Sequence, residues 1–308
     1  MGFRIGIVGS GAIGTYYGVK LANAGSDVHF LMRGDLSAVR RDGIFVHGEG
    51  ENFRVAKINC YNSTKEIGPC DLVIVAVKAT SNSDLFDLIP PLLHDGTMLL
   101  TLQNGLGNDE FLAKQFGAER VLGALCFIAI ARKTRMELER YAHGDIVLGE
   151  FGRNAQPRTH EVAAKFQLAN VRSHVTDDLA REQWRKLIWN IPFNGLSILV
   201  GGINTHAILD DKDLRQLALA LMEEVIAAAN KCGHALASDA WREMINRTET
   251  MGPYKPSTLL DWEAGRPLEI EAIWGEPLRR ATAAGGEMPR TEMIYALLKQ
   301  LDRIRGKG

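Results

Sequence analysis

A glycine-rich turn near the start of the chain constrains the fold more than any other feature. Arg4–Val8 is predicted to be a buried strand, the next six residues read Gly9-Ser10-Gly11-Ala12-Ile13-Gly14, and a helix is predicted from Thr15. In this G-x-G-x-x-G context the glycines allow a tight turn, close approach of a pyrophosphate and close helix–sheet packing. We therefore predict that these six residues and the helix N-terminus bind a dinucleotide. An ordinary glycine turn is the alternative.

The second predicted strand, 27–33, indicates which dinucleotide is bound. An NAD site places an acidic residue near the end of this strand, where it binds the ribose hydroxyls. Here the strand ends in Arg33-Gly34, and a planar guanidinium can hold the oxygens of a 2′-phosphate. We therefore predict NADP(H) as the cofactor. Asp35 is close enough to bind the ribose hydroxyls, so NAD remains an alternative cofactor. Arg33 could also be a solvated charge at the strand end.

Length and composition set the broad class. A chain of 308 residues with 46% hydrophobic and 24% charged residues is typical of a globular protein with two domains. The net charge of −1 gives no reason to expect nucleic acid or an anionic membrane as a partner. No apolar run approaches the roughly 18 residues of a membrane helix, and we expect no signal peptide.

The cysteines are scattered and do not form a metal-binding pattern. They lie at Cys60, Cys70, Cys126 and Cys232. Thiols without such spacing are typical of a protein in a reducing compartment. We therefore expect a cytoplasmic protein with no bound metal.

The first half of the chain alternates between predicted strands and helices. After the first two strands, 43–58 has short alternating runs, and 71–77 is an almost continuous apolar run of the kind found in parallel strands covered on both faces. A helix at 83–93, a strand at 97–102, a helix at 108–116 and a strand at 121–130 follow, with shorter strands to Leu148. This alternation predicts a Rossmann-type, doubly wound α/β sheet.

The second half is predicted to be helical. From Asp177 onward the patterns predict helices at 181–187, 214–232, 270–284 and 291–304. We therefore predict a dinucleotide-binding domain at 1–174 and an all-helical substrate and catalytic domain at 175–308. A homodimer through the helical domain is compatible with the sequence, which does not determine the oligomeric state.

Two polar residues follow predicted strands of the first domain. Lys78 comes directly after the strand that ends at Val77, and Asn104 comes shortly after Leu102. Lys78 could pair with a cofactor phosphate or a substrate anion, and Asn104 offers both a donor and an acceptor. The alternatives are a solvated lysine at a strand end and the turn residue of an Asn-Gly pair.

A sharper group of polar residues lies in the second domain. Lys186, Asn190 and Asn194 are spaced by four, so on a continuous helix they form one stripe. The residues between them are mostly apolar, and buried polar groups need partners. Pro192 lacks an N–H group and is expected to kink the helix. Unrelated surface polar residues are the alternative.

Two further residues lie at predicted helix starts. Ser257 begins a helix after Pro256, and Glu269 stands at the start of the helix predicted from Ile270. A glutamate in this position is also favoured simply by the helix dipole.

Taken in order, these motifs resemble the 2-dehydropantoate 2-reductase, or ketopantoate reductase, family. The similarity covers nearly the whole chain. The lysine–asparagine helix and the late serine and glutamate are more specific than the glycine loop. The residues that carry it are Gly9–Gly14, Lys78, Gln103-Asn104-Gly105, Trp184–Leu187, Asn190, Asn194, Pro256-Ser257 and Leu268–Glu271.

The resemblance implies NADPH-dependent reduction of 2-dehydropantoate to (R)-pantoate, in the pathway to pantothenate and coenzyme A. It implies two catalytic residues: Lys186 as the general acid that protonates the ketone oxygen, and Glu269, which orients lysine, substrate or cofactor ribose. It also implies that Asn190 and Asn194 hold substrate oxygens, that Ser257 contacts the carboxylate, and that Asn104 contacts both cofactor and substrate. Arg33 and Lys78 match family positions that contact the cofactor.

The sequence departs from the family pattern at two places. Gly195 follows Asn194 where the family commonly has proline, and Glu271 stands where aspartate is usual. We expect these changes to border the substrate pocket, which leaves the identity of the 2-oxo acid open. Two alternatives remain: a reductase of the same fold that acts on another 2-oxo acid, and a nucleotide-binding regulator without turnover.

Overall fold

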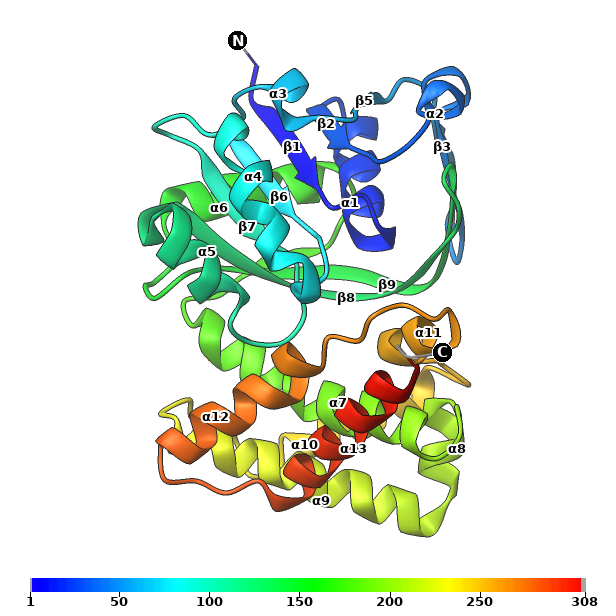
Figure 1. The fold of residues 1–308 in the computed structure, drawn as a ribbon, viewed down its shortest axis with the longest axis vertical. Helices are drawn as coiled ribbons and strands as arrows, with labels where there is room; N and C mark the ends of the chain where they lie inside the picture. The colour runs from blue at the N-terminus through cyan, green and yellow to red at the C-terminus, as the bar shows by residue number, and fades with distance from the viewer. Residues whose placement is uncertain (1, 306–308) are drawn as a thin grey trace. The chain divides into compact units, whose positions relative to one another are not determined.

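The computed structural model describes residues 2–305 and divides into two compact units. One unit comprises Met1–Gln103 and Asn108–Leu179, and the other comprises Asn104–Gly107 and Ala180–Gly308. Met1 and 306–308, which end the two predicted domains, lie outside the described residues. The first unit contains the sheet and the second is helical (Figure 1). The predicted fold class is therefore confirmed.

The first unit is built on one ten-stranded sheet. Its order is β4-β3-β9-β8-β7-β6-β1-β2-β5, with β10 beside β9. The strands are β1 Arg4–Val8, β2 Asp27–Leu31, β3 Ile44–Gly48, β4 Glu51–Val55, β5 Asn59–Tyr61, β6 Leu72–Val75, β7 Met98–Thr101, β8 Val121–Thr134, β9 Glu137–Glu150 and β10 Ser173–Val175. The run β5-β2-β1-β6-β7-β8 is parallel. With the β3–β4 hairpin set aside, it has the 3-2-1-4-5-6 order of dinucleotide-binding sheets, with the switch point at β1.

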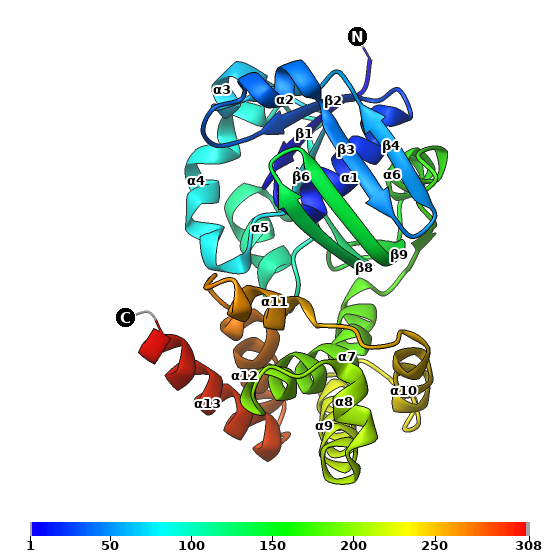
Figure 2. The same ribbon diagram turned by 90° about the vertical axis from the view of Figure 1, so that its right-hand side faces the viewer.

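Helices cover both faces of this sheet. They are α1 Ala12–Asn23, α2 Ser37–Asp42, α3 Thr64–Ile67, α4 Leu85–Leu88, α5 Asn108–Phe116 and α6 Pro157–Leu168, with 3₁₀ turns η1 Ala79–Asp84, η2 Pro90–Leu92 and η3 Ala118–Arg120. Helices α3, α4 and α5 lie on one face and α1 and α6 on the other, as the front and side views show (Figures 1 and 2). Each face has its own core: Ile7 of β1 packs on the α1 side, and its neighbour Val8 packs on the other. The alternation of side chains along a strand explains this division.

Three local predictions in this unit were wrong. The helix expected at 83–93 is divided among η1, α4 and η2, and α4 ends before Pro90 and Pro91, which lack the N–H groups a continuous helix needs. The shorter strands expected to Leu148 are the long strands β8 and β9, which pair antiparallel and make the sheet mixed. Strand β2 ends at Leu31, so Arg33 lies in the loop beyond it.

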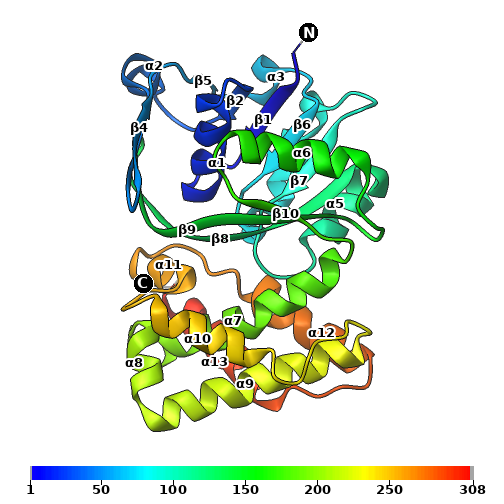
Figure 3. The same cartoon turned by 180° about the vertical axis from the view of Figure 1, so that it is seen from behind.

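The second unit packs around α7, Leu179–Leu199, whose first residue belongs to the sheet unit (Figure 3). The other helices are α8 Thr205–Asp210, α9 Lys212–Lys231, α10 Trp241–Thr250, α11 Ser257–Glu263, α12 Glu276–Ala283 and α13 Pro289–Arg305. Buried Trp184, Ile188 and Ile191 of α7 belong to the core of this unit. The helix continues through Pro192, which does not end it.

The helix predicted at 270–284 begins differently from expectation. Glu271–Gly275, labelled η4, is a π-helical turn that leads directly into α12. A π-turn carries one extra residue, which leaves a backbone carbonyl without its usual α-helical partner. Among residues 2–305, no helix is both long and apolar enough to span a bilayer.

Candidate functional site

Two glycines of the loop after β1 pack tightly against the rest of the protein, and the third faces open space. Gly9 has a φ of +106°, and a Cβ there would lie 2.3 Å from the backbone N of Val77. A Cβ on Gly14 would lie 2.1 Å from the carbonyl oxygen of Gly9. At Gly11 a Cβ would meet no atom within 4 Å. Gly9 and Gly14 are thus required by packing, whereas Gly11 leaves open space beside the loop.

The N-terminus of α1 opens onto the same loop. Gly11 is its N-cap residue and has no side chain with which to bond the N–H groups of the first turn. The Ser10 hydroxyl points elsewhere, because it donates to the carbonyl oxygen of Leu31 at 2.6 Å. The first turn of α1 carries no acidic residue. Its partial positive charge suits a phosphate group, so this loop fits a dinucleotide.

This geometry predicts different outcomes for two alanine substitutions. Gly11→Ala should leave the melting temperature unchanged but weaken dinucleotide binding, because its methyl group enters the space that the phosphates need. Gly14→Ala is the matched comparison. It should lower both the melting temperature and the affinity for the dinucleotide, because its methyl group meets the backbone of Gly9. Thermal unfolding and calorimetric titration with NADPH measure the two effects. Equal losses of stability in both variants would contradict this account.

The loop after β2 carries the two residues that bear on cofactor choice. The Arg33 side chain is 88% exposed, and its guanidinium lies 3.3 Å from the carboxylate of Asp84. Asp35 accepts hydrogen bonds from the backbone N and the hydroxyl of Ser37, each at 2.9 Å. These bonds hold the pKa of Asp35 below its usual range. Asp35, the residue that could have bound the ribose of NAD, is therefore hydrogen-bonded to the first turn of α2.

In the helical unit, Lys186 of α7 meets the short segment Asn104–Gly107. Its Nζ donates to Oδ1 of Asn104 at 2.8 Å. The N–H of Leu106 donates to the carbonyl oxygen of Ala272, in the π-turn, at 2.9 Å. Gly105 has a φ of +82°, and a Cβ there would lie 2.3 Å from that same oxygen. The π-turn thus fixes the segment that brings the Asn104 amide to the lysine.

The two asparagines on the same stripe of α7 are buried. Asn194 donates from Nδ2 to the carbonyl oxygen of Asn190 at 3.0 Å and accepts from the backbone N of Thr258 at 3.2 Å. Through the second bond it holds the first turn of α11, which begins at the exposed residue Ser257. Within the helical unit these contacts group the predicted residues of α7 with Asn104 and the start of α11.

Glu269 stands two residues before the π-turn and is half-buried. Its carbonyl oxygen accepts from the N–H of Ile273 at 3.1 Å, so its backbone begins this helical stretch. In the sheet unit, half-buried Lys78 follows β6 and is the N-cap residue of η1. Glu269 thus lies at the start of a helical stretch, as predicted, whereas Lys78 lies three residues beyond the end of β6 and not directly after it.

The two departures from the family pattern, Gly195 and Glu271, both make contacts with the last helices of this unit. A Cβ on Gly195 would lie 2.8 Å from Cγ2 of Ile294 in α13, so the glycine permits close packing between α7 and α13. The carboxylate of Glu271 accepts from the Tyr295 hydroxyl at 2.7 Å and from Arg279 at 2.8 Å. These contacts show that Gly195 packs against α13 and that Glu271 binds side chains of α12 and α13; that both border the substrate pocket stays a prediction.

Sequence reasoning did not identify Arg132 and Arg135, which reach the glycine loop and the loop after β2 from the β8–β9 hairpin. Arg132 donates to the carbonyl oxygen of Ser10, and Arg135 donates to that of Asp35. The pairs are separated by 122 and 100 residues, so short-range patterns do not reveal them. The basic run at 132–135 is the one sequence signal that could have drawn attention to them.

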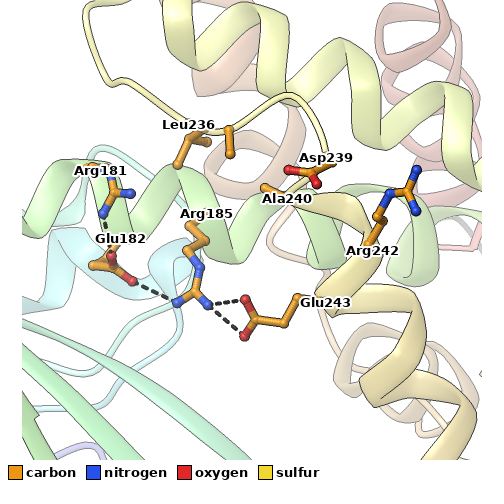
Figure 4. Close-up of a pocket in the computed structure, with 9 residues that line it drawn as sticks. Arg181, Glu182, Arg185, Leu236, Asp239, Ala240, Arg242 and Glu243 are labelled. Atoms are coloured by element: carbon orange, nitrogen blue, oxygen red, sulfur yellow. Dashed lines mark hydrogen bonds and ion pairs between the residues drawn. The ribbon is translucent and has the colours of Figure 1, made fainter.

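A separate pocket of about 580 Å³ lies beside α7 and α10 (Figure 4). Its charged side chains are largely paired with each other: Arg185 donates to Glu243 at 2.6 Å and to Glu182 at 3.2 Å. Since none of the predicted site residues lines it, we assign it no part in the reaction. The lining residues are Arg181, Glu182, Arg185, Leu236, Ala237, Asp239, Ala240, Arg242 and Glu243.

Comparison with known proteins covers both units. The family model described as ketopantoate reductase PanE/ApbA matches residues 5–153, and its C-terminal model matches residues 178–302. A curated 2-dehydropantoate 2-reductase from Nostoc sp. is 36% identical over 97% of this chain and 95% of its own length.

Solved structures agree with these matches. A 2-dehydropantoate 2-reductase from Geobacter metallireducens has a TM-score of 0.94 at 45% identity, covering 97% of this chain and all of its own. A D-mandelate dehydrogenase solved with NADH and anilino(oxo)acetate has a TM-score of 0.89 at 19% identity, covering 99% of each chain, and shows a shared fold. The glycine loop, the lysine-bearing helix and these matches over nearly all of both units lead to one assignment. The chain is an oxidoreductase that belongs to the ketopantoate reductase family.

Proposed function

We propose that this enzyme reduces 2-dehydropantoate to (R)-pantoate with NADPH, a step toward pantothenate and coenzyme A. The observation that carries the proposal is the bond between the Lys186 ammonium and the Asn104 amide, 2.8 Å long. It holds a group that can carry positive charge and release a proton on the stripe of α7 that also bears two asparagines. The substrate, 2-dehydropantoate, is proposed from the relatives that are named 2-dehydropantoate 2-reductase.

This geometry supports a proton-transfer step from Lys186. Reduction of a ketone develops negative charge on its oxygen, and a nearby ammonium stabilises that charge before donating its proton. We assign this role to Nζ of Lys186. Asn104 directs the ammonium by accepting one of its three N–H bonds, and we propose that Glu269 orients the lysine and the substrate.

The cofactor is assigned to the glycine loop of the sheet unit. The open space at Gly11 and the N-terminus of α1 suit its diphosphate, and Arg33 and Lys78 supply positive charge. When bound, the dinucleotide supplies the hydride. The engagement of Asp35 with Ser37 supports NADPH over NADH, because both oxygens of that carboxylate already accept hydrogen bonds within the protein.

The substrate is assigned to the α7 stripe and the start of α11. We propose that Asn190 holds substrate oxygens and that the exposed Ser257 hydroxyl binds the carboxylate. The Asn194 amide already bonds Asn190 and Thr258, so we propose that it acts mainly by holding α11 and Ser257 in place.

The direct test is NADPH oxidation with 2-dehydropantoate and three other 2-oxo acids. We expect the highest kcat/KM with 2-dehydropantoate and a preference for NADPH over NADH of more than tenfold. A higher kcat/KM with another 2-oxo acid would contradict the substrate assignment and favour a different reductase of this fold. NADPH binding without turnover of any acid would instead favour a nucleotide-binding regulator.

A further inference from the structure

We propose that Arg135, on the β8–β9 hairpin, forms a clamp with Arg33 for the adenosine 2′-phosphate of NADPH. This clamp makes Arg135 a determinant of cofactor specificity. In this arrangement Arg132 is a positioning residue that fastens the hairpin to the glycine loop. The inference rests on the proposed function, since it concerns the cofactor assigned there.

The first observation is the place of the Arg135 guanidinium. It donates to the carbonyl oxygen of Asp35, at the loop that follows β2. Its two terminal nitrogens lie 3.0 and 3.1 Å from the position that a Cβ on Gly34 would occupy. The guanidinium therefore covers Gly34, the residue next to Arg33. In dinucleotide-binding sheets an arginine near the end of the second strand accommodates the 2′-phosphate.

The second observation is how the hairpin is attached. Arg132 donates to the carbonyl oxygen of Ser10 in the glycine loop. From the same guanidinium it donates to the carbonyl oxygen of Arg135 at 2.6 Å and to that of Thr134 at 3.3 Å. Burial, and then the charge of Arg135, lower the pKa of Arg132. One half-buried side chain thus ties the turn that carries Arg135 to the loop assigned to the diphosphate.

The sheet register explains why the hairpin reaches this loop. Strand β3, which follows the Arg33 loop and α2, pairs in parallel with β9, with Phe45 opposite Glu137. The N–H of Phe45 also donates to the carbonyl oxygen of Met136 at 2.8 Å. Figure 2 shows the β8–β9 hairpin running beside β3 and β4. The turn between β8 and β9 is therefore held beside the segment that begins at Arg33.

The charge balance here favours an anion. Burial and then the charge of Arg135 lower the pKa of Arg132, and Asp35 is already bonded to Ser37. Arg33 is 88% exposed and 3.3 Å from Asp84, which makes a weak surface pair that a phosphate can replace. Two guanidinium groups can each hold a phosphate through two N–H bonds, which a lysine cannot do.

Calorimetric titration of the full-length protein tests the clamp. Arg135→Ala should weaken binding of NADPH and of 2′,5′-ADP by about ten- to a hundredfold, the usual effect of losing hydrogen bonds to a charged group. Binding of NADH and 5′-AMP, which lack the 2′-phosphate, should not change. Arg33→Ala should show the same selectivity. Lys133→Ala is the matched control, because Lys133 lies on the same hairpin but pairs with Glu139 at 2.8 Å.

The outcomes separate this inference from the function on which it rests. The clamp alone is overturned in two cases. In the first, Arg135→Ala keeps the wild-type preference for NADPH; in the second, Lys133→Ala loses as much affinity for NADPH as Arg135→Ala does. A wild type without any preference for NADPH overturns both the clamp and the cofactor assignment. If Arg135→Ala does not fold, Arg135→Lys is the alternative variant, because it keeps the positive charge but cannot offer two parallel N–H bonds to one phosphate. That variant should show a smaller, still selective loss, and unchanged affinity would overturn the clamp.

Discussion

Replacing Lys186 by alanine is expected to lower kcat at least about a hundredfold, because general acid catalysis typically contributes about 10²–10⁴-fold. The variant should still fold and bind NADPH, since the glycine loop lies in the sheet unit and Lys186 in the helical one. The decline in rate that we expect for the wild type at high pH should disappear in the variant. Steady-state kinetics across pH, together with NADPH titration, provide the measurements.

Two further variants sharpen this result. Lys186→Arg keeps a positive charge near Asn104 but cannot readily release a proton, so it should remain slow. Glu269→Ala should also lower turnover severely, through lost orientation, while keeping the decline at high pH. Near-normal turnover in folded Lys186→Ala protein would show that another group supplies the proton, and the assignment of Lys186 would have to be abandoned.

Glu150→Gln is expected to lower the free energy of unfolding by about 3 kcal/mol, because it breaks a buried ion pair. The Glu150 side chain, at the end of β9, is fully buried. It accepts from Arg158 at 2.6 and 2.9 Å, from Arg153 at 2.9 Å and from the Thr159 hydroxyl at 2.7 Å. This carboxylate joins β9 to the first turn of α6.

The loss should depend on pH in a definite direction. Burial acts to raise the pKa of Glu150, but the bonds from Arg158, Thr159 and Arg153 outweigh it and lower the pKa below its usual range. A lowered folded-state pKa means that the stabilisation is complete above the unfolded value of about 4.3 and is lost as pH falls through the folded value.

Urea denaturation at several pH values measures this effect. The difference in unfolding free energy between wild type and Glu150→Gln should be largest near neutral pH and shrink below about pH 4. Glu119→Gln is the control, because the Glu119 side chain is 69% exposed and its pairing distance to Arg120 is 3.8 Å. It should change stability little at any pH. A Glu150→Gln difference that is constant with pH would contradict the role given to this carboxylate.

Features set by short stretches of sequence could be predicted. The strand at Arg4–Val8 and the helix at Asn108–Phe116 have the predicted bounds. Lys186, Asn190 and Asn194 do share one helix, because a spacing of four residues is enough to place side chains on one stripe. The glycine loop follows the same logic, since its strand and helix are its immediate neighbours in the chain.

Features that depend on distant pairing could not be predicted. The long β8–β9 hairpin forms against β3, and this register brings Arg135 to Asp35 across 100 residues. The N–H of Leu106 donates to the carbonyl oxygen of Ala272 in the π-turn at 271–275, from a segment far earlier in the chain. Periodicity reports burial along one element and carries no information about such partners.

The placement of Asn104–Gly107 in the helical unit limits how this enzyme can be taken apart. A gene fragment that starts at Ala180 would encode the lysine-bearing helix without the amide that bonds Lys186 or the N–H that bonds Ala272. A fragment that ends at Leu179 would carry those four residues away from their partners. In split-protein reporters, and in exchanges of halves between relatives, Asn104–Gly107 and the helical half must therefore come from the same parent protein.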